Sequence, residues 1–148
     1  SSINSSINKD KVVWNIVGDG ELKGYIEKVS MMWDNVCYHG YVENNYLPSI
    51  YKNNNLFIST SKWESFPYNL LEAQSFGLPI VAYNIQGIKD IIEDKKNGYL
   101  VETFDQYKNK ITQIVNGKAF DKNLIRGYIT KKFDIEAIYD RLYNLFVI

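Results

Sequence analysis

The sequence contains little of several residue types, and each shortage excludes a class of protein. Its one cysteine, Cys37, cannot form an internal disulfide, and with the one histidine, His39, it supplies too few ligands for a metal cluster. Lysine plus arginine equals aspartate plus glutamate, at 17 each. This balance gives no support for a nucleic-acid-binding protein, because such proteins usually carry a basic excess.

Long hydrophobic runs are also missing. No window approaches the roughly 20 apolar residues that a membrane-spanning helix needs, and no cleavable signal is visible. We therefore expect a cytoplasmic protein, and a peripheral position on the inner face of the membrane stays open. The 148 residues suffice for one ordinary domain with a hydrophobic core.

The pattern of apolar residues predicts strands that alternate with helices. Strands are expected at 11–17, 36–42, 56–58, 80–83 and 99–101, and helices at 21–33, 46–51, 67–75, 87–93, 107–115, 124–129 and 135–146. This alternation predicts an α/β fold, with a parallel sheet that helices cover on both faces. Residues 1–10 are interpreted as a leader or linker, and residues 11–148 as one domain.

Two short patterns in the first half are weighed against simpler explanations. Gly18-Asp19-Gly20 follows a strand, but the dinucleotide-binding pattern needs a glycine at position 23, which is lysine. In the second strand, alternation places Cys37 and His39 on one face and Tyr38 on the other. We expect Cys37 to be a small buried side chain, and His39 to be structural or at the rim of a site.

The segment 58–84 is the strongest candidate for a functional site. It is predicted to form a strand, a loop with Glu64, a helix with Glu72 and a second strand. Two carboxylates near one helix N-terminus can accept hydrogen bonds from a vicinal diol, and the helix amides of residues 66–70 can bind phosphate. From spacing alone, it is equally open that Glu64 is an ordinary acid at the N-terminus of the helix and Glu72 an ordinary solvated helix residue.

The same segment resembles a known family. Glu64-Ser-Phe-Pro-Tyr-Asn-Leu-Leu-Glu72-Ala, followed by Gly77-Leu-Pro-Ile-Val-Ala, resembles the E-x7-E signature of retaining GT-B glycosyltransferases of family 4. The resemblance extends in register over residues 12–147. It implies a Rossmann-like parallel sheet with helices on both faces, namely the C-terminal, donor-binding half of a GT-B fold.

The resemblance also implies roles for particular residues. Glu64 would contact hydroxyls of the transferred sugar as the catalytic-site acid, and Glu72 would bind the ribose hydroxyls. Gly87 would shape a nearby loop rather than touch the donor. The remaining donor-binding positions are Gly18 in the cleft, Tyr41 and Val42 at the base, and Phe66, Tyr68, Asn69 and Leu70 around the diphosphate.

Some features of the family pattern are absent from the sequence. Ser65 stands where many relatives have glycine, and Pro67 lacks an N–H group. No Gly-Arg strand end or Lys-Gly loop precedes Lys11, and no acceptor-binding domain is present. We therefore expect a domain that is incomplete at its N-terminal edge, a fragment or one half of a split enzyme, nearly inactive alone.

The expected partners follow from the resemblance. They are a UDP-, GDP- or ADP-sugar, a glycan, lipid-linked or polysaccharide acceptor, and an N-terminal GT-B domain in the same or a partner chain. No nucleic acid, cofactor or metal is expected. Two alternatives stay open: a non-catalytic nucleotide-sugar-binding module and a domain similar to sugar-nucleotide epimerases.

Overall fold

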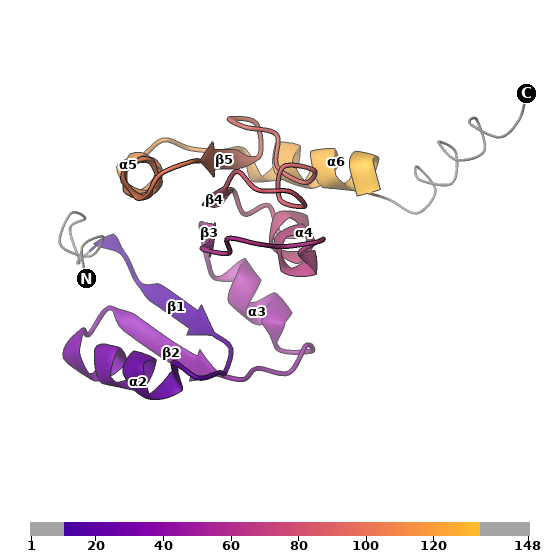
Figure 1. Cartoon of the computed structure of the whole chain (residues 1–148). Coiled ribbons are helices and arrows are strands. Elements are labelled where there is room, and N and C mark those ends of the chain that lie inside the picture. Colours follow the sequence, from indigo (N-terminus) through magenta and orange to yellow (C-terminus); the bar gives the residue numbers. More distant parts are fainter. Residues whose placement is uncertain (1–10, 134–148) are drawn as a thin grey trace, which may run out of the picture.

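The structure, a computed structural model, describes residues 11–133. Strands alternate with helices along most of this range, and the helices connect one strand to the next (Figure 1). The elements are β1 (Trp14–Val17), α2 (Lys23–Met32), β2 (Val36–Gly40), α3 (Leu47–Lys52), β3 (Phe57–Ser59), α4 (Tyr68–Ser75), β4 (Ile80–Tyr83), β5 (Gly98–Val101), α5 (Phe104–Val115) and α6 (Lys122–Phe133). Residues 1–10, which the sequence suggests are a leader or linker, and the helix expected at 135–146 lie outside the described residues.

All strand pairs in the described range are parallel, but they form two hydrogen-bonded groups. β1 pairs with β2, and β3, β4 and β5 form a second group in that order. No ladder joins β1 to β3. The two groups still meet, because Asn15 Nδ2 donates to Asn54 Oδ1 over 3.1 Å and Trp14 packs against a core cluster of the second group.

The core lies on both faces of β4, as the alternation along this strand requires. Ile80 and Ala82 belong to one cluster with Leu70 of α4 and Ile129 of α6. Val81 points to the other face, into a cluster that contains Tyr107 and Ile111 of α5. The predicted α/β fold, with parallel strands and helices on both faces, is confirmed.

Two structural expectations are wrong, namely the burial of Cys37 and the helix at 87–93. Cys37 is exposed rather than buried: α2 packs against β2, and the half-buried residues of this strand are Val36, Tyr38 and Gly40, which alternate with Cys37. The predicted alternation of Cys37 and His39 against Tyr38 is confirmed. Residues 86–91 form consecutive turns and no helix, because Gly87 has φ +83° and the Glu93 amide donates to Asn97 Oδ1 over 2.8 Å.

The helix α2 is more exposed than its apolar residues suggest. Leu22, Ile26, Val29 and Met32 have helical spacing in the sequence, yet Leu22 and Met32 are largely exposed, and α2 buries no residue. Among residues 11–133, no helix is both long enough and apolar enough to span a membrane.

Candidate functional site

Glu64 lies in the loop that connects β3 to α4. Its side chain is half-buried, and its Oε1 accepts a hydrogen bond of 2.9 Å from Ser61 Oγ at the start of the same loop. The chain around Gly87 supports this loop. A Cβ atom at position 87 would lie 2.5 Å from the Ser65 carbonyl oxygen and 2.7 Å from that of Glu64, so only glycine allows this approach. The Glu64 carboxylate therefore has a fixed position.

Glu72 lies on α4, where its side chain is exposed. Its Oε2 accepts a hydrogen bond of 2.9 Å from the hydroxyl of Tyr51 on α3. Burial raises the pKa of the Tyr51 hydroxyl well above its usual value, and the hydrogen bond to the Glu72 carboxylate and the charge of that carboxylate raise it further. Tyr51 therefore stays protonated and donates to Glu72 throughout the neutral range.

The N-terminus of α4 lies between the two glutamates in sequence. Pro67 is its N-cap and has no N–H group, and no side chain in the described range caps this end. The Leu70 amide already donates to the Pro67 carbonyl oxygen over 3.1 Å, and the Leu70 side chain is fully buried. The amides of Tyr68 and Asn69 are therefore those best placed to donate to an anion, at the positive end of the helix dipole.

The side chains beside these amides are aromatic and accessible. Phe66 is 39% exposed and meets Tyr68 edge to face, with 5.6 Å between ring centroids. Its other edge-to-face contact is with Phe133 at the end of α6. Phe66 is thus held by packing on the side of α6, whereas Tyr68 is 72% exposed.

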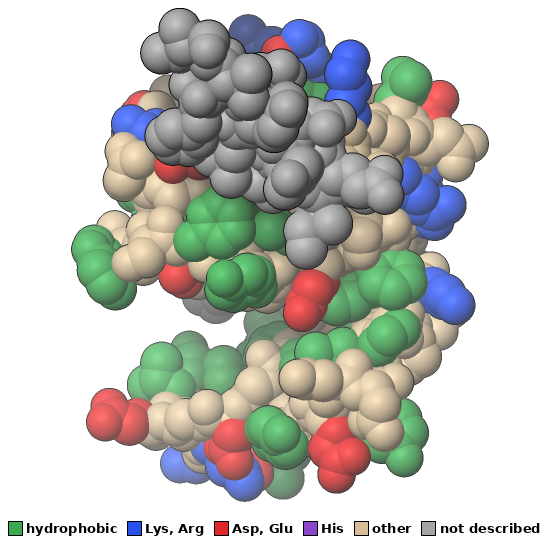
Figure 2. Space-filling model, turned by 90° about the vertical axis from the view of Figure 1, so that its right-hand side faces the viewer, with side chains coloured by type: hydrophobic (Ala, Val, Ile, Leu, Met, Phe, Trp, Pro, Cys, Tyr) green, Lys and Arg blue, Asp and Glu red, His purple; other side chains and the backbone are tan. Residues whose placement is uncertain are grey.

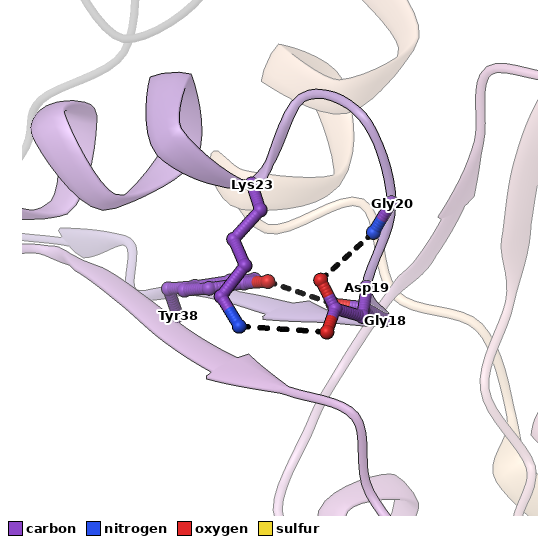
Figure 3. A network of polar contacts seen from close by, with 5 residues as sticks. All are labelled: Gly18, Asp19, Gly20, Lys23 and Tyr38. Atoms are coloured by element: carbon purple, nitrogen blue, oxygen red, sulfur yellow. Dashed lines mark hydrogen bonds and ion pairs between the residues drawn. The ribbon is translucent and has the colours of Figure 1, made fainter.

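The turn after β1 brings Gly18 to the end of β2 (Figure 3). The Gly18 amide donates to the Gly40 carbonyl oxygen over 2.7 Å, and the Tyr38 hydroxyl donates to the Gly18 carbonyl oxygen over 3.0 Å. Asp19 accepts from the Gly20 amide over 2.9 Å and lies 3.5 Å from Lys23 Nζ. Tyr41 and Val42 follow β2 directly, with Tyr41 exposed and Val42 half-buried.

The predicted site residues thus lie in segments that follow strand ends. Gly18 follows β1, Tyr41 follows β2 and Glu64 follows β3. Ligands of open parallel sheets bind outside the carboxyl ends of the strands, so this edge is the expected place for a ligand. Figure 2 shows a hollow across one face of the molecule, with hydrophobic and acidic side chains on both margins.

A cavity of about 410 Å³ lies at the ends of β4 and β5. Neither Glu64 nor Glu72 lines it; its lining is Lys62, Tyr83, Asn84, Ile85, Val101, Glu102 and Phe104. Asn84 Nδ2 donates to Glu102 Oε1 over 2.7 Å within this lining. Sequence reasoning missed these residues, although Asn84 and Glu102 each follow a predicted strand directly.

Sequence reasoning also missed Ser61 and Tyr51 as partners of the two glutamates. Ser61 precedes Glu64 by three residues, which is a spacing that could have suggested a local hydrogen bond. Tyr51 is 21 residues from Glu72, so only the packing of α3 against α4 reveals this contact. Among residues 11–133, no three His, Cys, Asp or Glu side chains come together as metal ligands.

Comparison with known proteins identifies the class. Residues 3–138 match the family model described as glycosyl transferases group 1. This chain belongs to that family, and the expected assignment to family 4 with a GT-B-type fold is confirmed.

Named relatives agree with this assignment. The chain is 31% identical over 144 residues to an Escherichia coli UDP-Gal:alpha-D-GlcNAc-diphosphoundecaprenol alpha-1,3-galactosyltransferase, covering 91% of this chain and 36% of that protein. It superimposes on Staphylococcus aureus TarM with a TM-score of 0.77 and 30% identity, covering 98% of this chain and 30% of TarM. The pneumococcal O-GlcNAc transferase GtfA, in complex with UDP and GlcNAc, shares the fold with a TM-score of 0.75 and 23% identity, over 97% of this chain and 30% of GtfA. The chain thus spans about a third of the length of each of these relatives.

Proposed function

We propose that this chain is the donor-binding domain of a retaining glycosyltransferase, which transfers a sugar from a nucleotide sugar to a glycan, lipid-linked or polysaccharide acceptor. The observation that carries the proposal is the pair of carboxylates, Glu64 and Glu72, placed before and within a helix whose N-terminus has no side-chain cap. Along the chain, one carboxylate precedes the anion-binding amides and the other follows them. This order matches a nucleotide sugar, in which a diphosphate joins the sugar hydroxyls to the ribose hydroxyls. The UDP in the GtfA complex is consistent with such a donor.

Each group has a definite task in this proposal. Glu72 accepts hydrogen bonds from the ribose diol, and Glu64 accepts them from hydroxyls of the transferred sugar near its anomeric carbon. The amides of Tyr68 and Asn69 donate to the diphosphate. Negative charge grows on this leaving group as the glycosidic bond breaks, so the helix dipole and these amides stabilise the transition state. Gly18, Tyr41 and Val42 contact the base side of the donor.

Transfer also requires groups that residues 11–133 do not supply in this proposal. An N-terminal GT-B domain, in the same or a partner chain, would bind the acceptor and close over the donor. We therefore expect the isolated 148-residue chain to bind nucleotide sugars weakly and to transfer almost no sugar. No metal or cofactor is required in this scheme. Robust turnover by the isolated chain would contradict the expected division of labour.

Calorimetric titration tests the site assignment. UDP, GDP, ADP and their sugars are titrated into the wild type, Glu64→Ala and Glu72→Ala. Glu72→Ala should weaken nucleotide binding about tenfold or more, because hydrogen bonds to a charged group are lost. Glu64→Ala should retain nucleotide affinity and lose the preference for the nucleotide sugar.

Glu27→Ala, on α2 and away from the proposed ligand, is the matched control and should bind like the wild type. Unchanged binding in both site variants would overturn the site assignment. Absence of binding to any of the nucleotides and their sugars by the wild type would overturn the proposed function.

A further inference from the structure

We infer that Tyr51 is a positioning residue for the donor, which holds the Glu72 carboxylate in the orientation that recognises the ribose diol. This inference rests on the proposed function and names the group that makes its ribose contact specific. It is carried by the hydrogen bond of 2.9 Å from the Tyr51 hydroxyl to Glu72 Oε2. Within residues 11–133, Tyr51 is the only side chain bonded to this carboxylate.

The ring of Tyr51 has a fixed place in the core. Its exposed fraction is 9%, and it belongs to a cluster with Ala73 and Leu78. It stacks on Phe76, with 5.5 Å between centroids and 17° between planes, and its centroid lies 6.2 Å from that of Phe57. The hydroxyl at the end of this ring is therefore a fixed hydrogen-bond donor.

Glu72 depends on that donor because its own surroundings constrain it little. It is an exposed helix residue, and an exposed glutamate usually samples several rotamers. Ordering such a side chain when a ligand binds costs about 1–2 kcal/mol of entropy. A hydroxyl that already holds Oε2 removes part of this cost before the nucleotide arrives, which is preorganisation of the binding site.

The hydrogen bond leaves Glu72 able to bind a diol. A carboxylate offers about four acceptor positions, and Tyr51 occupies one of them on Oε2. A ribose diol donates two hydrogen bonds, so the tyrosine and the ligand do not compete. Because the raised pKa of Tyr51 keeps its hydroxyl protonated, the hydroxyl remains a donor and never repels the carboxylate as a phenolate at neutral pH.

The location of Tyr51 adds a link between two parts of the proposed site. It lies on α3, which begins at Leu47, five residues after Val42. Tyr41 and Val42 are the segment proposed to meet the base, and Glu72 is proposed to meet the ribose. The short helix α3 therefore connects the segment proposed to meet the base to the glutamate proposed to meet the ribose. Tyr51 is the residue of α3 that bonds to the Glu72 carboxylate.

The test measures ribose recognition rather than affinity alone. UDP and 2′,3′-dideoxy-UDP are titrated into the wild type and Tyr51→Phe, which keeps the ring and removes the hydroxyl; if GDP or ADP binds more tightly, it and its dideoxy analogue are used instead. The wild type should prefer the ribose form about tenfold or more. Tyr51→Phe should reduce this preference three- to tenfold by weakening binding of the ribose form, with binding of the dideoxy form unchanged.

Two controls separate positioning from a general structural role. Tyr107→Phe removes another buried hydroxyl, which donates to the Ser59 carbonyl oxygen over 3.1 Å, and should leave the ribose preference unchanged. In a Glu72→Ala background, Tyr51→Phe should have no further effect on affinity, because the tyrosine acts through Glu72. Thermal melting confirms that each variant is folded.

The outcomes distinguish this inference from the proposed function. A folded Tyr51→Phe variant with the ribose preference of the wild type overturns the role of Tyr51 and leaves the proposed function standing. An effect of Tyr51→Phe that persists without Glu72 also overturns it. If the wild type binds none of UDP, GDP and ADP, the proposed function fails, and the inference fails with it.

Discussion

Residues 11–50 and residues 51–133 differ sharply in how much side-chain surface they bury. No residue between 11 and 50 is buried, and the exposed side chains include Tyr25, Met31 and Met32 of α2. All the buried hydrophobic side chains of the described range lie between Tyr51 and Ile129. The first region is therefore held mainly by the β1–β2 ladder and half-buried contacts, and the second by a core on both faces of β4.

This difference matters because the proposed donor would contact both regions. Gly18, Tyr41 and Val42 belong to the first region, whereas Glu64 and Glu72 are anchored to the second. Segments with few buried apolar contacts open more readily than a packed core. We therefore expect the base side of the site to be the more adaptable and the sugar side to be preorganised, and four predictions test this contrast.

The largest expected effect comes from removing matched isoleucine side chains in the two regions. Ile80→Ala, at a fully buried position of β4, should lower the free energy of unfolding by about 3 kcal/mol, through lost burial and a cavity. Ile26→Ala, at a half-buried position of α2, should cost about 1 kcal/mol. Urea denaturation measures both values. Equal losses would show that the first region is as well packed as the second.

Substitution of two glycines gives the next largest effect. Gly87 has φ +83°, and an added Cβ would clash with the carbonyl oxygens of Glu64 and Ser65, so Gly87→Ala should cost about 2 kcal/mol or more. Gly18 has φ +124° but no atom within 4 Å of an added Cβ. Gly18→Ala should therefore cost only the backbone strain of about 1–3 kcal/mol, whereas Gly87→Ala adds the clash to a similar strain.

Nucleotide-sugar titration adds a functional readout to the glycine pair. Gly87→Ala should displace the Glu64 loop and weaken recognition of the sugar, because the clash falls on the backbone of Glu64 itself. A Gly87→Ala variant with stability and sugar recognition like the wild type would contradict the support that we assign to this loop.

The contrast also explains which parts of the fold were predictable from sequence. The run at 80–83 is apolar on both faces and was predicted as a strand, because a strand covered by helices on both sides needs no polar residue. Cys37 was predicted to be buried and is exposed, and Met32, which lies at helical spacing with other apolar residues, is exposed as well. An apolar pattern shows which face of a strand or helix could be buried. It does not show whether another element packs against that face.

The candidate site was predictable only where its residues are close in sequence. The spacing of Glu64 and Glu72 and the Gly-Leu-Pro break are local features, and they located the strand, loop and helix correctly. The contacts of Tyr51 with Glu72 and of Gly87 with Ser65 join segments about 20 residues apart. No periodicity encodes such contacts, because they depend on how one helix or turn packs against the next.

A third prediction concerns alkaline pH and belongs to the packed region. Burial raises the pKa of Tyr107 well above its normal value of 10.0, with a further contribution from the charge of Tyr83. Unfolded tyrosine ionises near pH 10 while folded Tyr107 stays protonated, so the stability it contributes is present below pH 10 and is lost as pH rises further. Its contribution falls by up to about 1.4 kcal/mol per pH unit in this window.

Denaturation of the wild type and Tyr107→Phe between pH 8 and 11 measures the contribution of Tyr107 to the free energy of unfolding. At pH 8 the variant should lose about 1 kcal/mol, because the hydroxyl no longer donates to the Ser59 carbonyl oxygen. Above pH 10 the two curves should converge, since only the wild type loses stability through Tyr107. Parallel curves up to pH 11 would contradict the raised pKa.

The smallest expected effect lies in the exposed region, at the ion pair between Asp19 and Lys23. Lys23 Nζ lies 3.5 Å from Asp19 Oδ2, and the side chains of Lys23 and Asp19 are 50% and 45% exposed, so water screens their attraction. Lys23→Ala should change the free energy of unfolding by less than about 0.5 kcal/mol, and 1 M NaCl should abolish the difference. The turn in Figure 3 is then held through the backbone of Gly18, whose amide donates to the Gly40 carbonyl oxygen and whose carbonyl oxygen accepts from the Tyr38 hydroxyl. A loss above about 1 kcal/mol would mean that side-chain charge stabilises this turn as strongly as burial stabilises the packed region, which would remove the contrast between the two regions.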